Sequence, residues 1–161
     1  MDSPRGFTGG QAWYTVSILT LGYVLASADR QILALLVEPI KDDLILSDTQ
    51  FSLIGGFAFV ILYALLGIPI GYLADNISRK KIILVGLLVW TGMTALCGTA
   101  RNFVQLLLYR VGVGAGEAGL GPAGSSAIAD LFPPKRRGLA MGLFITGTTL
   151  GTGTALFVAA P

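Results

Sequence analysis

Long stretches without a charged residue alternate with short polar segments along this chain. A helix rises about 1.5 Å per residue and needs about 20 mostly apolar residues to cross the hydrocarbon core of a bilayer. The uncharged stretches reach that length, and the polar segments fall where helices would leave the membrane. The pattern therefore predicts about five membrane-spanning helices, at 11–38, 48–74, 82–100, 103–131 and 139–161.

Polar and helix-breaking residues set the boundaries of these spans. Ser47 and Gln50 form a Ser-x-x-Gln capping box, which predicts that the second helix begins there. The segment 38–43 before it, with its proline and charges, is expected to form a polar turn. A charged link at 75–81 follows the second span, and the two prolines and three cations of 132–138 end the fourth.

The composition agrees with a membrane protein. Apolar residues make up 53% of the chain and charged residues 12%, whereas about a quarter of a soluble domain is charged. We therefore predict an all-α protein with several spans. Histidine is absent and Cys97 stands alone, which excludes a disulfide within the chain and zinc, haem or triad chemistry based on His or Cys clusters. We expect no enzyme, no cofactor and no metal site.

Basic residues outside the spans are distributed unequally between the two ends of the predicted helices. Cytoplasmic loops carry the excess of Lys and Arg, which sets the orientation of a membrane protein. We therefore expect a multi-pass protein of the bacterial inner membrane whose amino terminus faces the cytoplasm. That orientation places Arg5, Arg79, Lys80, Lys81, Lys135, Arg136 and Arg137 inside, and Lys41 and Arg101 outside.

Four charged residues lie deep inside the predicted spans, away from the span ends: Asp29, Arg30, Arg110 and Glu117. A charge at the bilayer centre costs about 2.5–3.5 kcal/mol on insertion scales, so these side chains need partners or water. Counted from the outer ends of their helices, Asp29 lies about 14 Å deep, Arg110 about 10 Å and Glu117 about 21 Å. Depth predicts an Asp29–Arg110 pair and leaves Glu117 to Arg30 or to water.

Arg110 and Glu117 are seven residues apart and are expected on one face of their helix. Static salt bridges between two helices are one interpretation of the four charges. A wet cavity is the other, and we favour it because glycines leave little side-chain bulk in the same segment. These glycines are Gly112, Gly114, Gly116, Gly119 and Gly121.

We interpret the four charges as a site that couples a proton to a substrate. Burial opposes ionisation of Asp29 and Glu117 while a neighbouring arginine favours it, so a small change in contacts can protonate either carboxylate. Protonation would release Arg30 or Arg110, whose guanidinium suits a carboxylate or phosphate on a substrate. Two further residues at similar depth are candidate substrate-binding residues: Gln31 and Tyr63.

Three other interpretations are weaker. The first apolar run resembles a signal peptide cleaved near Ala28, but it continues past Arg30 for a span of about 27 residues. Residues 114–119 match the dinucleotide motif G-x-G-x-x-G without its alternating strands and helices, so helix packing explains them better. The basic clusters at 79–81 and 135–137 are expected to anchor the chain at the cytoplasmic surface and not to bind nucleic acid.

The fifth predicted span carries two G-x-x-x-G stripes, at 138–142 and 147–151, which pack against another helix. Five spans are an odd total for a bundle. We therefore expect residues 1–161 to be an incomplete transmembrane half of a longer polypeptide, whose later helices complete the bundle.

The segment 71–80, GYLADNISRK, resembles the loop signature G-x-L-A-D-R-x-G-R-K of the major facilitator superfamily. Asn76 stands where Arg is usual, and Ser78 where Gly is usual. The resemblance implies an amino-terminal half built from inverted three-helix repeats. It also implies a cytoplasmic conformational gate, in which Asp75 faces a helix of the missing carboxyl-terminal half. The gate residues are Gly71, Asp75, Arg79 and Lys80.

Within this superfamily, residues 26–56 and 109–138 resemble the Spinster-like branch. The resemblance implies a proton-coupled secondary active transporter that works by alternating access, with the four buried charges in its cavity. The implied substrate is a lysolipid, a sphingoid phosphate or a similar amphiphilic anion. Proton symporters of small organic anions such as sugar acids place similar charges in the same helices, so that substrate class is an alternative. A non-transporting membrane assembly module, whose charges only specify helix pairing, is an alternative of another class.

Overall fold

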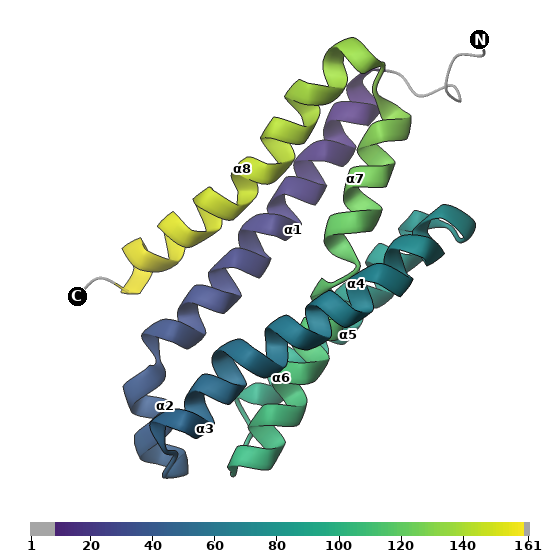
Figure 1. The fold of residues 1–161 in the computed structure, drawn as a ribbon. Coiled ribbons are helices and arrows are strands. Elements are labelled where there is room, and N and C mark those ends of the chain that lie inside the picture. Colours follow the sequence, from purple (N-terminus) through teal and green to yellow (C-terminus); the bar gives the residue numbers. More distant parts are fainter. Residues whose placement is uncertain (1–8, 160–161) are drawn as a thin grey trace.

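The described part of the chain is helical and contains no strand, which confirms the all-α fold class. A computed structural model describes residues 9–159, apart from the side chains at 57–59, 62 and 74–76. Figure 1 shows the elements. They are α1 (Gly9–Leu35), α2 (Val37–Leu44), α3 (Asp48–Ser52), a π-helical turn (Leu53–Phe57), α4 (Ala58–Asn76), α5 (Arg79–Cys97), α6 (Phe103–Glu117), α7 (Leu120–Leu131) and α8 (Pro134–Ala159).

Three described helices are long and apolar enough to cross a membrane: Gly9–Leu35, Arg79–Cys97 and Pro134–Val158. The two remaining predicted spans are interrupted. The π-helical turn precedes α4, and Ala118 and Gly119 separate α6 from α7. Pro122 accounts for the second interruption, because it has no N–H to donate to the carbonyl of Ala118. The prediction of one continuous helix over 103–131 is therefore wrong.

The segment expected to be a polar turn is instead the short helix α2. Pro39 is tolerated there because it is the third residue of the helix, where a backbone N–H has no intrahelical partner. Val37, Ile40 and Leu44 share one side of α2 and pack against a cluster that contains Phe51. The helix boundary at Ser47 is confirmed, since the Ser47 hydroxyl accepts from the backbone N–H of Gln50 and the Gln50 side chain accepts in return.

The last helix also begins earlier than expected. α8 starts at Pro134 and not at 139, because proline is favoured at the first position of a helix. α8 lies alongside α1 (Figure 1). A Cβ added at Gly151 would lie 2.2 Å from the carbonyl oxygen of Val24, so only glycine permits this approach. The partner of the 147–151 glycine stripe is therefore α1 and not a later helix.

A second tight contact joins α5 to α6. A Cβ added at Gly116 would lie 2.6 Å from the carbonyl oxygen of Gly86 and 2.5 Å from the backbone nitrogen of Trp90. Gly112 likewise faces Met93 of α5. Gly112 and Gly116 therefore give the close approach expected of small residues, and the element that approaches them is α5.

Candidate functional site

The buried face of α6 carries two charges in an otherwise apolar row. Leu106, Arg110, Val113 and Glu117 are all buried, at spacings of three or four residues that keep them on one side of the helix. α1 and α6 run in opposite directions in Figure 1. Asp29 and Arg30 lie in the last two turns of α1, and their side chains reach the buried charges of α6.

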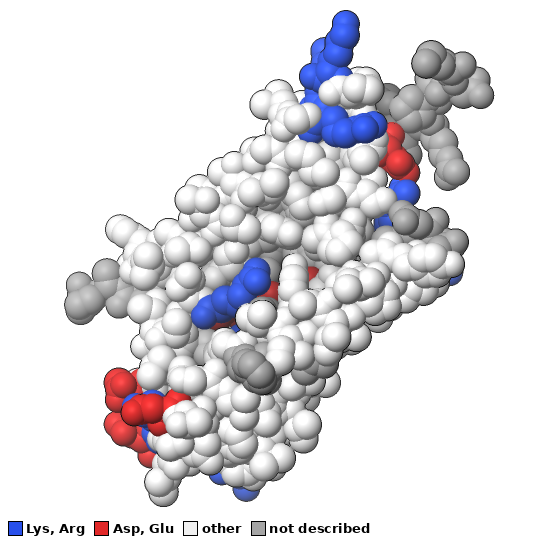
Figure 2. All heavy atoms as spheres, in the orientation of Figure 1, with Lys and Arg blue, Asp and Glu red and all other residues white. Residues whose placement is uncertain are grey.

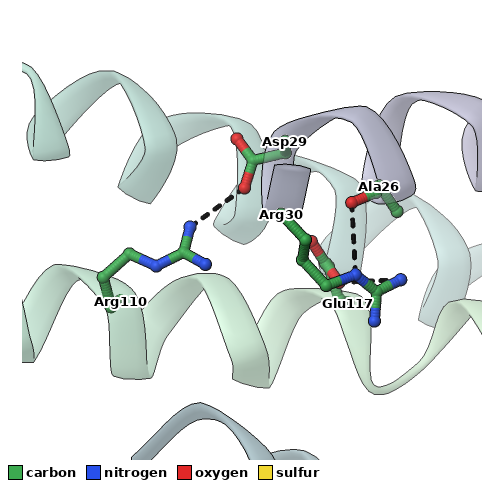
Figure 3. Close-up of polar contacts among 5 residues, drawn as sticks. All are labelled: Ala26, Asp29, Arg30, Arg110 and Glu117. Carbon is green, nitrogen blue, oxygen red and sulfur yellow. Dashed lines mark hydrogen bonds and ion pairs between the residues drawn. The ribbon is translucent and has the colours of Figure 1, made fainter. Parts of the chain in front are cut away.

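Asp29 and Arg110 form the first ion pair. Nη1 of Arg110 donates to Oδ2 of Asp29 at 3.0 Å, and Figure 3 shows the two side chains pointing toward each other from α1 and α6. The Arg110 side chain is 4% exposed and that of Asp29 is 15% exposed. The pairing predicted from depth is confirmed. A charged hydrogen bond at this depth is stronger than one in water because few water molecules compete for it.

Arg30 and Glu117 form the second pair, which is looser. Nη2 of Arg30 lies 3.6 Å from Oε2 of Glu117, and Nε of Arg30 donates to the carbonyl oxygen of Ala26 one turn earlier at 3.3 Å. Figure 3 shows both contacts. The Arg30 side chain thus folds back along α1 toward Glu117. Glu117 is 2% exposed, whereas Arg30 is 37% exposed, so the guanidinium lies between the buried carboxylate and the surface.

Access to the four charges is therefore uneven. Figure 2 shows a small group of basic and acidic atoms in the middle of an otherwise uncharged surface, well away from the charged ends of the molecule. Arg110 itself is buried. A hollow between α4, α5 and α6 lies elsewhere and has an apolar lining that includes Leu66, Ile70, Val85 and Val89.

The other two candidate binding residues differ in their surroundings. Tyr63 of α4 packs against a buried cluster formed by Ala26, Trp90 and Val113, close to the charges. Gln31 is half-buried on α1. In the described part of the chain, no hydrogen bond or ion pair joins Gln31 to the four charges.

The expected gate residues lie at the far end of α4 and the start of α5. Arg79 forms an ion pair with Asp130 at the end of α7, and Lys80 is exposed. Gly71 faces Pro122 of α7. Asp75 lies in the last turn of α4, and its side chain is outside the described residues. The loop signature thus contacts α7 within this chain, through Asp130. Asp130 is not among the predicted gate residues.

Two aromatic residues near the second ion pair were also missed. Tyr23 precedes Arg30 by seven residues on α1. This is about two helical turns, so the sequence predicts that Tyr23 lies on the same face of α1 as Arg30. Trp90 carried no such signal. It joins a buried cluster with Ala26 and Val113 because α5 packs closely on α6 at Gly116.

Comparison with known proteins places these findings in a family. A profile of the Major Facilitator Superfamily matches residues 19–160. An MFS-type efflux pump of Mycolicibacterium smegmatis is 40% identical over 150 residues, 89% of this chain and 35% of the pump. A probable L-galactonate transporter of Escherichia coli is 31% identical over 138 residues, 86% of this chain and 30% of that protein.

A solved structure resembles the fold described above. It is the crystal structure of a bacterial homologue of the human lysosomal transporter Spinster, in an inward-facing and unoccupied conformation. The TM-score is 0.90 at 40% sequence identity, over 95% of this chain and 32% of that chain. The resemblance to the Spinster-like branch is therefore confirmed, and the chain spans about a third of the length of the relatives it matches.

Proposed function

Because the chain belongs to the major facilitator superfamily of integral membrane transporters, we propose that its full-length protein is a proton-coupled secondary active transporter of an amphiphilic anion. The substrate class is a lysolipid or a sphingoid phosphate. The observation that carries the proposal is the Asp29–Arg110 and Arg30–Glu117 arrangement between α1 and α6, with one guanidinium partly open to solvent. Two apolar pairs would usually stabilise a bundle as well, so buried charges favour a functional role.

The coupling step follows from the chemistry of the two pairs. A proton taken up by the carboxylate of Asp29 or Glu117 removes the negative charge that holds an arginine. The guanidinium stays charged and becomes available to a phosphate or carboxylate of the cargo. Arg30 reaches the cargo first, because it is the most exposed of the four. Tyr63 and Gln31 are proposed to line the path beside it.

The transport cycle is proposed to be alternating access. The gate is the loop signature, with Gly71, Asp75, Arg79 and Lys80 at the cytoplasmic ends of α4 and α5. The ion pair of Arg79 with Asp130 supports this role, since it ties the loop to α7. We place the protein in a bacterial inner membrane with a cytoplasmic amino terminus, on the distribution of basic residues.

The alternative function is proton symport of a small organic anion such as a sugar acid. A hexuronate transporter of Escherichia coli is 32% identical over 145 residues, which supports that alternative. The Spinster homologue is 40% identical, and the amphiphilic anion is the substrate class that the resemblance to the Spinster-like branch implies. Both functions use the same four charges and differ in cargo.

Transport by the full-length protein in proteoliposomes tests the proposal. An imposed pH gradient is expected to drive accumulation of a lysophospholipid or sphingoid phosphate in preference to a hexuronate. Asp29→Asn and Glu117→Gln are expected to abolish gradient-driven accumulation, because neither amide takes up the coupling proton. Undiminished accumulation in both variants contradicts proton coupling through these residues.

The assembly-module alternative predicts a different result. Asp29→Leu with Arg110→Met replaces the first ion pair by apolar side chains of similar size, which a purely structural pair tolerates. A carrier is expected to fold and to lose transport. The matched control is Lys41→Met with Asp48→Leu, which removes an ion pair at the polar segment between the first two spans, where the Asp48 side chain is exposed. Full transport by the first double variant overturns the proposed site.

A further inference from the structure

Glu117 and Trp90 bury polar atoms that have no hydrogen-bond partner in the described part of the chain. These atoms are both carboxylate oxygens of Glu117 and Nε1 of Trp90. The Arg30 guanidinium, at 3.6 Å, is beyond hydrogen-bond distance of Glu117. Buried polar atoms of this kind are normally paired, so water, an ion or a ligand is expected to supply the partner.

The residues that carry the unpaired donor and acceptors lie on adjacent helices, since a Cβ added at Gly116, next to Glu117, would lie 2.5 Å from the backbone nitrogen of Trp90. Trp90 packs against Ala26 of α1 and Val113 of α6. Ala26 precedes Arg30 by four residues, and Val113 precedes Glu117 by four. The indole is therefore about one helical turn from the second ion pair on both helices.

Two tyrosine hydroxyls approach the same place from α1 and α4. A Cβ added at Gly121 would lie 2.9 Å from the hydroxyl oxygen of Tyr23 and 3.5 Å from that of Tyr63. Any residue larger than glycine at position 121 would therefore meet the Tyr23 hydroxyl.

We propose that Glu117, Trp90 and Tyr23 form a subsite for a hydroxyl group of the cargo, beside the anion-binding Arg30. A hydroxyl donates one hydrogen bond and accepts others, which suits a buried carboxylate next to an N–H and an O–H donor. A cationic group fits less well, because the Arg30 guanidinium would repel it. This inference rests on the proposed transport function and narrows its cargo to hydroxylated anions.

Arg30 controls entry to this subsite. It folds back over Glu117, and it is the exposed member of the pair. The anionic group of an arriving cargo attracts the guanidinium, and its displacement opens the carboxylate to the hydroxyl that follows. The anion and the hydroxyl are then bound side by side.

A matched pair of cargoes tests the subsite in proteoliposomes of the full-length protein. One is a 1-acyl lysophosphatidic acid with a free glycerol hydroxyl, and the other is its deoxy analogue. A hydrogen bond to a charged group favours the hydroxylated cargo by about 10- to 100-fold in kcat/KM. Hexuronate and a deoxyhexuronate form a second pair, which tests the subsite if the transporter carries sugar acids.

Two conservative variants remove the donors separately. Trp90→Phe and Tyr23→Phe are each expected to lower the preference for the hydroxylated cargo by about tenfold, with little effect on the deoxy analogue. Trp13→Phe and Tyr14→Phe on α1 are the matched controls, because these residues lie away from the four charges. Should Trp90→Phe fail to fold, Tyr23→Phe still measures the subsite.

The outcomes separate the two proposals. Equal transport of hydroxylated and deoxy cargo by the unaltered protein overturns the subsite and leaves the transport function intact. Transport of the hexuronate pair alone, with a preference for the hydroxyl, overturns the amphiphilic cargo and keeps the subsite. Failure to bind or transport either pair overturns both.

Discussion

At the residue scale, Ile45 adopts a backbone conformation that its side chain disfavours. It ends α2 with φ 53° and ψ 53°, in the left-handed region, and its side chain is 91% exposed. A branched Cβ in this region costs about 1–2 kcal/mol, because it crowds the neighbouring carbonyl oxygen. Because the Ile45 side chain is not buried, no packing energy offsets that cost. A residue that tolerates this backbone conformation can therefore relieve the strain.

Replacing Ile45 by Asn is therefore expected to stabilise the protein. Asn tolerates the left-handed region, and the gain in free energy of unfolding is about 1 kcal/mol. Denaturant unfolding of the full-length protein in detergent measures it. Ile45→Thr is the control, because it adds polarity while it keeps the branched Cβ. Equal stabilisation by Thr and Asn would attribute the effect to polarity and not to the backbone.

Depth along a helix is enough to predict which buried charges pair. The rise per residue is fixed, so Asp29 and Arg110 reach the same level whatever the details of packing. The looseness of the second pair was not predictable, because it depends on the rotamer that returns Arg30 toward Ala26. Trp90 could not be assigned to the site either, since the sequence does not say which face of α5 meets α6.

At the element scale, glycines decide which helices touch. Gly151 and Gly153 are neighbours on α8 with opposite surroundings. A Cβ at Gly151 would lie 2.2 Å from the carbonyl oxygen of Val24 and 2.8 Å from the Cβ of Ser27, whereas nothing lies within 4 Å of one at Gly153. Two substitutions of the same type therefore distinguish packing from helix propensity.

Gly151→Ala is expected to lower the free energy of unfolding by about 1–3 kcal/mol, because α1 and α8 must separate to admit the methyl group. Gly153→Ala is expected to raise it by up to about 1 kcal/mol, through the better helix propensity of alanine. Unfolding of the two variants of the full-length protein in detergent checks both signs. A stabilising Gly151→Ala would show that the contact between α1 and α8 is looser than described here.

The sequence predicts most of the elements and misses their interruptions for identifiable reasons. The capping box at Ser47 predicts the start of α3 correctly, whereas α8 begins at Pro134 and not at 139. The segment of α2 is predicted as a turn because of its proline and charges. The apolar residues Val37, Ile40 and Leu44 of α2 have a helical spacing, which favours a helix over a turn. The break after Glu117 depends on Pro122. The sequence is sufficient to predict this break, because a proline has no N–H to donate to the carbonyl of Ala118.

At the scale of the whole molecule, the charges divide the bundle into two ends and a middle. Figure 2 shows charged atoms gathered at both ends, with basic atoms prevailing at the end nearest the start of α8. The sequence predicted this division but not the neighbours of each helix. α1 and α8 are apolar on most of their surface, so their hydrophobic pattern does not select one partner.

The orientation of the bundle is the last prediction, and it follows from the basic end. The first turn of α5 carries Arg79, Lys80 and Lys81, so the link between α4 and α5 is expected in the cytoplasm, and α2 on the opposite side. In full-length protein with Cys97→Ala and no other cysteine, Asp43→Cys is expected to react with a membrane-impermeant maleimide from outside intact cells. Ser78→Cys is expected to react only after the inner membrane is permeabilised.

Both labelled positions are exposed, so a failure to react reflects the side of the membrane and not burial. Labelling after denaturation confirms that each cysteine is present and reduced, and the parent protein without cysteine gives the background. The reverse pattern, with Ser78→Cys reactive from outside, would invert the bundle. It would then place the loop signature on the outer surface, where it could not act as a cytoplasmic gate, and the proposed proton path would enter from the opposite side.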